Sequence, residues 1–259
     1  MTFFPLPAFN DNYIWITKDA TQKTIWAVDP GDAQVVLDYC KAEHLTLAGI
    51  LITHHHKDHT GGVEALKKEF NCPTYGPESL SPTLVTHPLR QGESVTVHYQ
   101  EFLVLETPGH TLDHICYFAE PEQQAPQLLC GDTLFRGGCG RLFEGSPAQM
   151  LNAMTRLREL PHATQVYGTH EYTLANYRFA LAIDPNNTAL ANANHEAEAL
   201  RAKDTPTLPT TIALEAQTNP FMRFDWQQVV AGAAHLLNED PAQDLINGFA
   251  QIRRAKDGF

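Results

Sequence analysis

The chain has 259 residues, 43% of them apolar, so it can bury a full hydrophobic core as one large domain or as a domain with an appendage. Its 18 Lys and Arg residues stand against 30 Asp and Glu residues, and the formal net charge of −12 disfavours a protein that binds nucleic acid through the phosphate backbone. No apolar stretch approaches the ~20 residues that a membrane helix needs, so we expect no membrane partner.

The first residues and the cysteines indicate a cytoplasmic protein. The stretch MTFFPLPAFNDNY lacks the basic region and long apolar run of a secretion signal. The cysteines are odd in number and form no C-x-x-C pair, which disfavours a disulfide framework or a cysteine zinc knuckle; they are Cys40, Cys72, Cys116, Cys130 and Cys139. We therefore expect buried, reduced thiols, and we expect a monomer.

The predicted elements begin with a hairpin. Two apolar runs within residues 13–28 flank a polar turn, and Asp29-Pro30-Gly31 ends the second run. A helix is predicted over 33–41 from its apolar spacing. The apolar run LAGILIT (47–53) then has the length of a strand, and GGVEALKKEF (61–70) is rich in helix-forming residues. The stretch between them therefore lies in a strand-to-helix loop.

Three later segments repeat this strand-to-loop pattern. FLVLETPGHT (102–111), QLLCGDTLF (127–135) and TQVYGTHEYT (164–173) each run from an apolar strand into a turn. Each strand end carries one residue that is able to bind a metal ion: His110, Asp132 and His170.

Helices dominate the rest of the chain. Ser146 as N-cap and Pro147 at the first helical position predict a helix in SPAQMLNAMTRLREL. After Tyr172, Ala-rich stretches separated by proline predict helices over 174–183, 188–203, 225–237 and 242–256. We therefore predict a mixed α/β catalytic domain at 1–172 and a helical domain at 173–259.

The loop after the 47–53 strand reads THHHKDH. His54 and His56 are two residues apart on a chain leaving a strand, so their side chains point the same way and can share one metal ion, while His55 points to the other side. Asp58 and His59 follow in the turn and offer a carboxylate and an imidazole to a neighbouring ion. With the three residues at the other strand ends, five histidines and two aspartates suffice for two ions with one bridging carboxylate.

Other histidines are isolated in the sequence, and an isolated histidine is more often a capping or surface residue than a ligand. We interpret six of them in this way: His44, His87, His98, His162, His195 and His235. A surface polar loop or an expression tag is the alternative interpretation of THHHKDH, but a tag is terminal and lacks the aspartate.

THHHKDH, TPGHT, GDT and GTHEYT, in this order, resemble the metallo-β-lactamase superfamily with its H-x-H-x-D-H motif. Within it the chain is similar to glyoxalase II, the hydroxyacylglutathione hydrolase family, over essentially its whole length. The matching stretches are AFNDNYIWI, GDTLFRGGCGRLFEG, NPFMRF and RRAKD. The resemblance implies an α/β fold, a four-layer αββα sandwich with a C-terminal helical domain.

The resemblance also implies a dinuclear metal site. It assigns His54, His56 and His110 to one ion and Asp58, His59 and His170 to the other, with Asp132 between them. Zinc is the first choice, and His and Asp donors also suit iron and manganese. Two such ions would hold a bridging water and lower its pKa, so that hydroxide attacks the substrate without a protein base. The implied reaction is hydrolysis of S-D-lactoylglutathione to D-lactate and glutathione, the second step of methylglyoxal detoxification.

An anionic glutathione thioester needs local positive charge in a protein with this net charge. The family pattern points to Arg141, Tyr172, Arg253 and Lys256 as substrate contacts, and it has a tyrosine where this chain has Phe143. A cationic last turn that favours the helix C-terminus is the alternative interpretation of RRAK.

Three rival functions differ in their sequence requirements. A glutathione persulfide dioxygenase of the same fold binds one iron and lacks the helical C-terminal part, whereas residues 173–259 form a long appendage here. A nuclease of the superfamily calls for a basic surface, and this chain is acidic. A binding module with a degenerate site would lack a ligand, and each position of the motif is filled.

Overall fold

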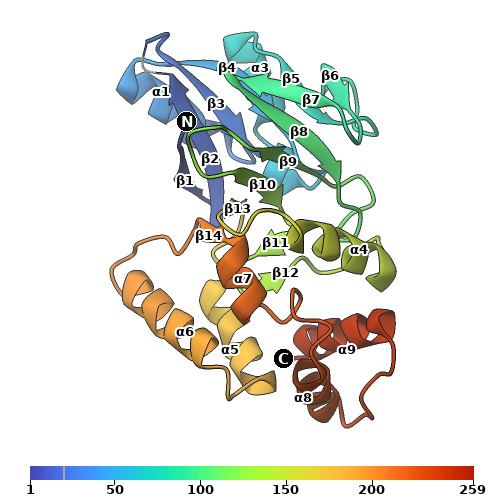
Figure 1. Cartoon of the computed structure of the whole chain (residues 1–259). Coiled ribbons are helices and arrows are strands. Elements are labelled where there is room, and N and C mark those ends of the chain that lie inside the picture. Colours follow the sequence, from blue (N-terminus) through green and yellow to red (C-terminus); the bar gives the residue numbers. More distant parts are fainter. Residues whose placement is uncertain (20) are drawn as a thin grey trace.

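Two β-sheets lie face to face in the computed structural model, which describes residues 1–19 and 21–259 (Figure 1). The first has the order β1-β2-β3-β4-β5-β6. Its strands are β1 (Phe3–Ala8), β2 (Asn12–Asp19), β3 (Thr24–Val28), β4 (Thr46–Leu51), β5 (Thr74–Pro77) and β6 (His87–Leu89). The predicted hairpin is β2 and β3, which pair antiparallel, and β3 to β6 run parallel.

The second sheet has the order β14-β13-β10-β9-β8-β7. Its strands are β7 (Ser94–Val97), β8 (Gln100–Glu106), β9 (Ile115–Ala119), β10 (Gln127–Gly131), β13 (Gln165–Gly168) and β14 (Thr210–Thr211). Strands β10 and β13 are parallel, so their carboxyl ends meet at one edge of the sheet. Between them in the chain lies the short hairpin of β11 (Leu134–Phe135) and β12 (Gly138–Cys139).

Helices cover the outer face of each sheet and complete the αββα sandwich that the family resemblance implies. Trp15 and Leu51 of the first sheet pack against Phe102 and Tyr117 of the second in the central core. Helices α1 (Ala33–Glu43) and α3 (Val63–Phe70) cover the first sheet. Helices α4 (Pro147–Arg158), α8 (Gln227–Leu237) and α9 (Leu245–Asp257) share a core with the second sheet.

The remaining helices are α2 (Lys57–Thr60), α5 (Thr173–Ile183), α6 (Thr188–Arg201) and α7 (Ile212–Thr218). Helix α4 has the predicted cap, since the Ser146 hydroxyl accepts from the Gln149 amide in a capping box. The sequence pattern does not predict ten elements, most of which are short or have mixed burial: α2, which lies within the predicted loop, α7, β1, β5, β6, β7, β9, β11, β12 and β14.

Two predicted helices begin later than expected. The predicted 225–237 helix begins at Gln227, because the Trp226 amide closes a turn onto the Arg223 carbonyl at 3.0 Å. The predicted 242–256 helix begins at Leu245, because Asp244 is its N-cap and accepts from the Asn247 amide at 3.0 Å. Within the described residues no helix is both long enough and apolar enough to cross a bilayer, and the five cysteines are buried and unpaired.

Candidate metal centre

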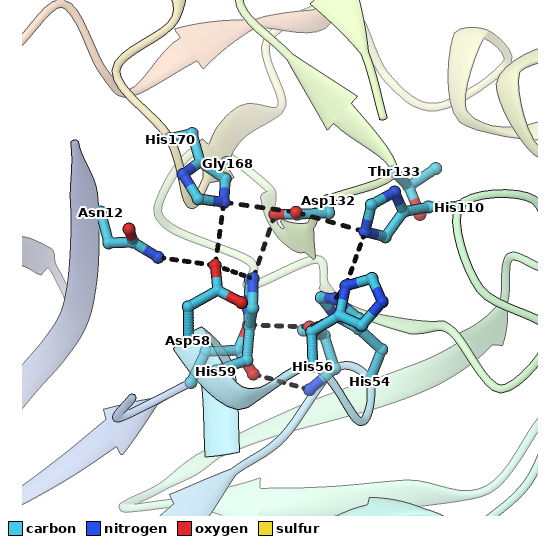
Figure 2. Close-up of polar contacts among 12 residues, drawn as sticks. Asn12, His54, His56, Asp58, His59, His110, Asp132, Thr133, Gly168 and His170 are labelled. Carbon is cyan, nitrogen blue, oxygen red and sulfur yellow. Dashed lines mark hydrogen bonds and ion pairs between the residues drawn. The ribbon is translucent and has the colours of Figure 1, made fainter. Parts of the chain in front are cut away.

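The seven residues that the sequence groups together converge at one edge of the sandwich (Figure 2). They come from both sheets. His54 and His56 follow β4, and helix α2 carries Asp58 and His59. His110 lies between β8 and β9, and Asp132 and His170 follow the parallel strands β10 and β13, respectively.

One half of the cluster consists of three imidazoles. His54 Nε2 lies 3.1 Å from His56 Nδ1, and His110 Nε2 lies 3.0 Å from the same atom. These three nitrogens form a group able to hold one metal ion. The arrangement follows from the alternation of side chains after β4, which puts His54 and His56 on the same side.

The other half consists of Asp58, His59 and His170, which also form a possible metal-binding group. Asp58 Oδ2 lies 3.4 Å from His59 Nε2 and 3.5 Å from His170 Nε2. Asn12 Nδ2 donates to the same carboxylate oxygen at 3.1 Å and so holds it in place.

The Asp132 carboxylate lies between the two halves. One oxygen is 3.4 Å from His110 Nε2 and 3.3 Å from His170 Nε2, and the other is 3.4 Å from His59 Nε2. Its side chain is 8% exposed. Asp132 is thus placed where a single carboxylate can face two cations.

Buried side chains orient the imidazoles from behind. Asp29 is 2% exposed and accepts from the Thr53 amide, the Thr53 hydroxyl and His59 Nδ1 at 2.7, 2.7 and 3.0 Å. Because the Thr53 hydroxyl donates to Asp29, it accepts from His54 Nδ1 at 3.0 Å. In the neutral rings, the Nε2 atoms of His54 and His59 therefore face the cluster as acceptors.

His110 and His170 are oriented in the same way, by hydrogen bonds from Nδ1 to oxygen atoms outside the cluster. His110 Nδ1 donates to the Arg141 carbonyl at 2.7 Å, and His170 Nδ1 donates to the Asp11 carboxylate at 2.8 Å. A carbonyl oxygen only accepts, so His110 Nε2 carries a lone pair in the neutral ring. His56 Nδ1 can donate to only one of its two nitrogen neighbours, so at least one close contact pairs two acceptors. A cation resolves that conflict.

The charges of the cluster act on its pKa values. Burial lowers the pKa of His54 well below its usual value. Burial also acts to lower the pKa values of His59 and His170, but the carboxylates, Asp132 foremost, outweigh it and raise both. Burial opposes ionisation of Asp132, yet the charges of His59 and His170 hold its pKa well below the usual range. The carboxylates thus draw positive charge into this half, as a divalent cation site requires.

The residues present fit two metal ions. Among the described residues, His59 Nε2 and Asp132 Oδ1 are buried without a hydrogen-bond partner, and such atoms are costly unless something binds them. Five imidazoles and two carboxylates are the donors that zinc, iron and manganese accept.

His55 lies outside the cluster, as the alternation predicts. Its Nδ1 is 3.0 Å from the Asp113 carboxylate and its Nε2 is 3.2 Å from the Glu144 carboxylate. Within residues 1–19 and 21–259, none of the six isolated histidines joins a group able to hold a metal ion.

Two aromatic rings flank the cluster. Phe143 is 62% exposed and meets His56 and His110 edge-on, with ring centroids 5.6 and 5.3 Å away. Tyr172 is partly exposed and stacks on His170 at 4.6 Å. Beside it, a hollow of about 410 Å³ is lined by Asp58, His170, Tyr172 and the 9–12 loop.

The basic candidates differ in their surroundings. Arg141 is exposed, and its Nε donates to Asp257 at 3.2 Å. Lys256 Nζ donates to the Ala175 carbonyl in the first turn of α5 at 3.1 Å. Arg253 is 7% exposed and donates to the Cys139 carbonyl at 3.0 Å and to Asp257 at 2.9 and 3.1 Å. Arg253 therefore holds the β11-β12 hairpin against α9.

The residues that surround the ligands could not be singled out from the sequence. In the sequence, Asp29 indicates only the end of a hairpin, and no local pattern marks Asp11, Asn12 or His114. Each is a single residue without a motif of its own, and its partner lies far away in the sequence. The short stretch from His110 to His114 is the one local signal that could have drawn attention to His114.

Comparisons with known proteins identify the family of the chain. A model described as metallo-beta-lactamase superfamily matches residues 41–170, and one described as hydroxyacylglutathione hydrolase C-terminus matches residues 171–259. A hydroxyacylglutathione hydrolase of Marinomonas sp. (strain MWYL1) is 58% identical, with 100% of both chains covered. The chain belongs to the hydroxyacylglutathione hydrolase family. A second family member, from Shewanella baltica (strain OS223), is 48% identical with the same coverage.

Solved structures share the fold of this hydroxyacylglutathione hydrolase family member. ETHE1 from Myxococcus xanthus aligns with a TM-score of 0.66 and 24% identity, covering 98% of this chain and 99% of that one. TTHA1623, solved in a di-iron-bound form, aligns with a TM-score of 0.58 and 26% identity, covering 84% and 99%.

Proposed function

We propose that the chain hydrolyses S-(2-hydroxyacyl)glutathione thioesters, with S-D-lactoylglutathione as substrate and D-lactate and glutathione as products, in the second step of methylglyoxal detoxification. The observation that carries the proposal is the largely buried cluster of histidine and aspartate donors at the sheet edge. Membership of the hydroxyacylglutathione hydrolase family along the full chain supports the choice of substrate.

We propose two divalent cations as cofactors, zinc in first place and iron or manganese as alternatives. His54, His56 and His110 would hold one, Asp58, His59 and His170 the other, and Asp132 both. Bound there, the cations would supply an activated water as nucleophile and a Lewis acid for the thioester carbonyl. The di-iron form of TTHA1623 supports a two-metal site in this fold.

The chain's own residues supply binding and orientation. Phe143 and Tyr172 stand on either side of the cluster and present apolar ring surface to the acyl group. A thiolate is a good leaving group, so the chain needs no side chain as a strong general acid. Four imidazoles have Nδ1 hydrogen bonds that keep their Nε2 atoms directed at the reacting centre: those of His54, His59, His110 and His170.

We propose that residues 173–259 form the domain that captures glutathione. The carboxylates of the tripeptide require cations. Arg141 and Lys256 lie where the loop between β12 and α4 meets α5 and α9. Asp257 joins Arg141 to Arg253, so the buried arginine supports the exposed one. Arg253 then contributes to substrate binding chiefly by holding this junction.

The test is a pair of measurements on purified protein. Elemental analysis should give close to two divalent ions per chain, and thioester cleavage should be fast with S-D-lactoylglutathione and slow with S-lactoyl-N-acetylcysteamine, which lacks the glutathione carboxylates. Equal rates with the two thioesters would contradict the glutathione site. Oxygen uptake with glutathione persulfide, together with one iron per chain, would establish the dioxygenase instead.

A further inference from the structure

His114 lies behind the candidate metal centre, in the turn that enters β9, and belongs to neither half of the cluster. The residue is 1% exposed. Its ring stacks on that of His54, with centroids 4.8 Å apart and an interplanar angle of 23°. A histidine buried so deeply requires partners for both ring nitrogens.

The hydrogen bonds fix which nitrogen of His114 carries the proton. The backbone amide of Asp132 donates to Nε2 at 3.1 Å, so Nε2 is the acceptor. Nδ1 lies 3.0 Å from the hydroxyls of both Thr107 and Thr133, and it donates its proton to one of them. Burial lowers the pKa of His114 well below its usual value, which agrees with a neutral ring.

The contact to Asp132 occurs where strand β10 has ended. Gly131 is the last paired residue of the strand and has a φ of +45°. A Cβ at this position would lie 2.3 Å from Thr53 Oγ1 and 2.9 Å from His114 Nε2, so only glycine lets the chain pass this closely. The Asp132 amide therefore donates to a side chain from another strand connection and not to a neighbouring strand.

We propose that His114 is a positioning residue that fixes the backbone of Asp132 and, through it, the direction of the carboxylate. An aspartate side chain has two rotatable bonds, so a fixed backbone confines its oxygens to a small volume. Those oxygens lie 3.3–3.4 Å from ring nitrogens on both sides of the cluster. The inference rests on the metal site proposed above.

Two substitutions separate the roles of the ring nitrogens. In His114→Gln the side-chain amide reaches the place of Nε2, and its oxygen can accept from the Asp132 amide. In His114→Asn the shorter amide reaches the place of Nδ1 and leaves the Asp132 amide without an acceptor. Both variants lose the ring that stacks on His54, so that loss is common to the pair.

The readout is metal affinity, measured by competition with a chelator, and the absorption spectrum of the cobalt-substituted protein. His114→Asn should weaken metal binding by about 10- to 100-fold, which is the usual effect of losing a residue that orients a ligand, and should change the cobalt spectrum. His114→Gln should bind metal nearly as wild type does. Thr107→Val is the control, because Thr133 still accepts from Nδ1 and the contact to Asp132 remains.

Each outcome decides the question. Wild-type affinity in His114→Asn overturns the inference, as does equal loss in both variants or failure of both to fold, because the ring would then matter for packing alone. If the wild-type protein itself binds no divalent ion, the metal site is wrong and not only the role of His114. Weak binding in the Asn variant with recovery in the Gln variant supports the inference.

Discussion

Replacing Arg253 with alanine should destabilise the protein far more than it weakens substrate binding. The guanidinium donates to the buried Cys139 carbonyl at 3.0 Å, pairs with Asp257, and lies 4.8 Å from the ring centroid of Phe221. An unpaired buried carbonyl costs about 1–3 kcal/mol, and a desolvated cation–π contact adds about 2 kcal/mol.

The two terms sum to about 3–5 kcal/mol, which corresponds to a fall in Tm of roughly 6 to 20 °C for a chain of this size. Thermal unfolding measures it directly. Arg254→Ala is the matched control, because Arg254 is the next residue, is exposed, and pairs with Glu239 at the surface. A surface pair contributes about 0–1 kcal/mol, so the Tm of the control should stay within a few degrees of wild type.

Kinetics complete the test. If Arg253→Ala keeps the Tm of the control while KM for the glutathione thioester rises tenfold or more, Arg253 contacts substrate directly and its role at the hairpin is secondary. If Tm falls and the remaining folded enzyme has a modest rise in KM, the arginine supports the junction that carries Arg141.

The remaining predictions concern the cluster and the last helix. Asp132→Ala should lose bound metal and hydrolysis together, and full metal content with a near-normal rate would contradict its bridging position. His55→Ala should leave metal content unchanged, since both ring nitrogens face carboxylates outside the cluster; loss of an ion would be the contrary result. Burial lowers the pKa of Lys256 to about 8, so the protonated form that attracts a carboxylate declines above that pH. KM should therefore rise as pH increases through 8, and Lys256→Arg should abolish the rise; a constant KM in the wild type would refute it.

The histidine loop after β4 is the part of the site that the sequence predicts best. After β4 the side chains alternate, and this period alone placed His54 with His56 and turned His55 away. The same reasoning gave no distance between this loop and His110, Asp132 or His170. Their assignment to particular ions came from the family resemblance and stays a proposal.

Residues that act through long-range packing could not be predicted. Asp29 is 24 positions from Thr53 and 30 from His59, and it touches both only because β3 and β4 pair in parallel. The burial of Arg253 could not be predicted from the sequence either, because a cationic last helical turn has the same sequence whether it faces solvent or packs against another element. The first residues of α8 and α9, Gln227 and Leu245, are set by a turn and by an N-cap, and the spacing of apolar residues predicts neither.

The candidate ligands come from both sheets, β4 on one side and β10 and β13 on the other. Bound ions would therefore act as a cross-link between the two halves of the sandwich, and an unfolded chain has no comparable site. By mass action, one site adds about 2.7 kcal/mol to the free energy of unfolding when free metal is roughly 100 times Kd. The melting temperature would then follow the free-metal concentration, and metal starvation would expose the chain to proteolysis as well as stopping its chemistry.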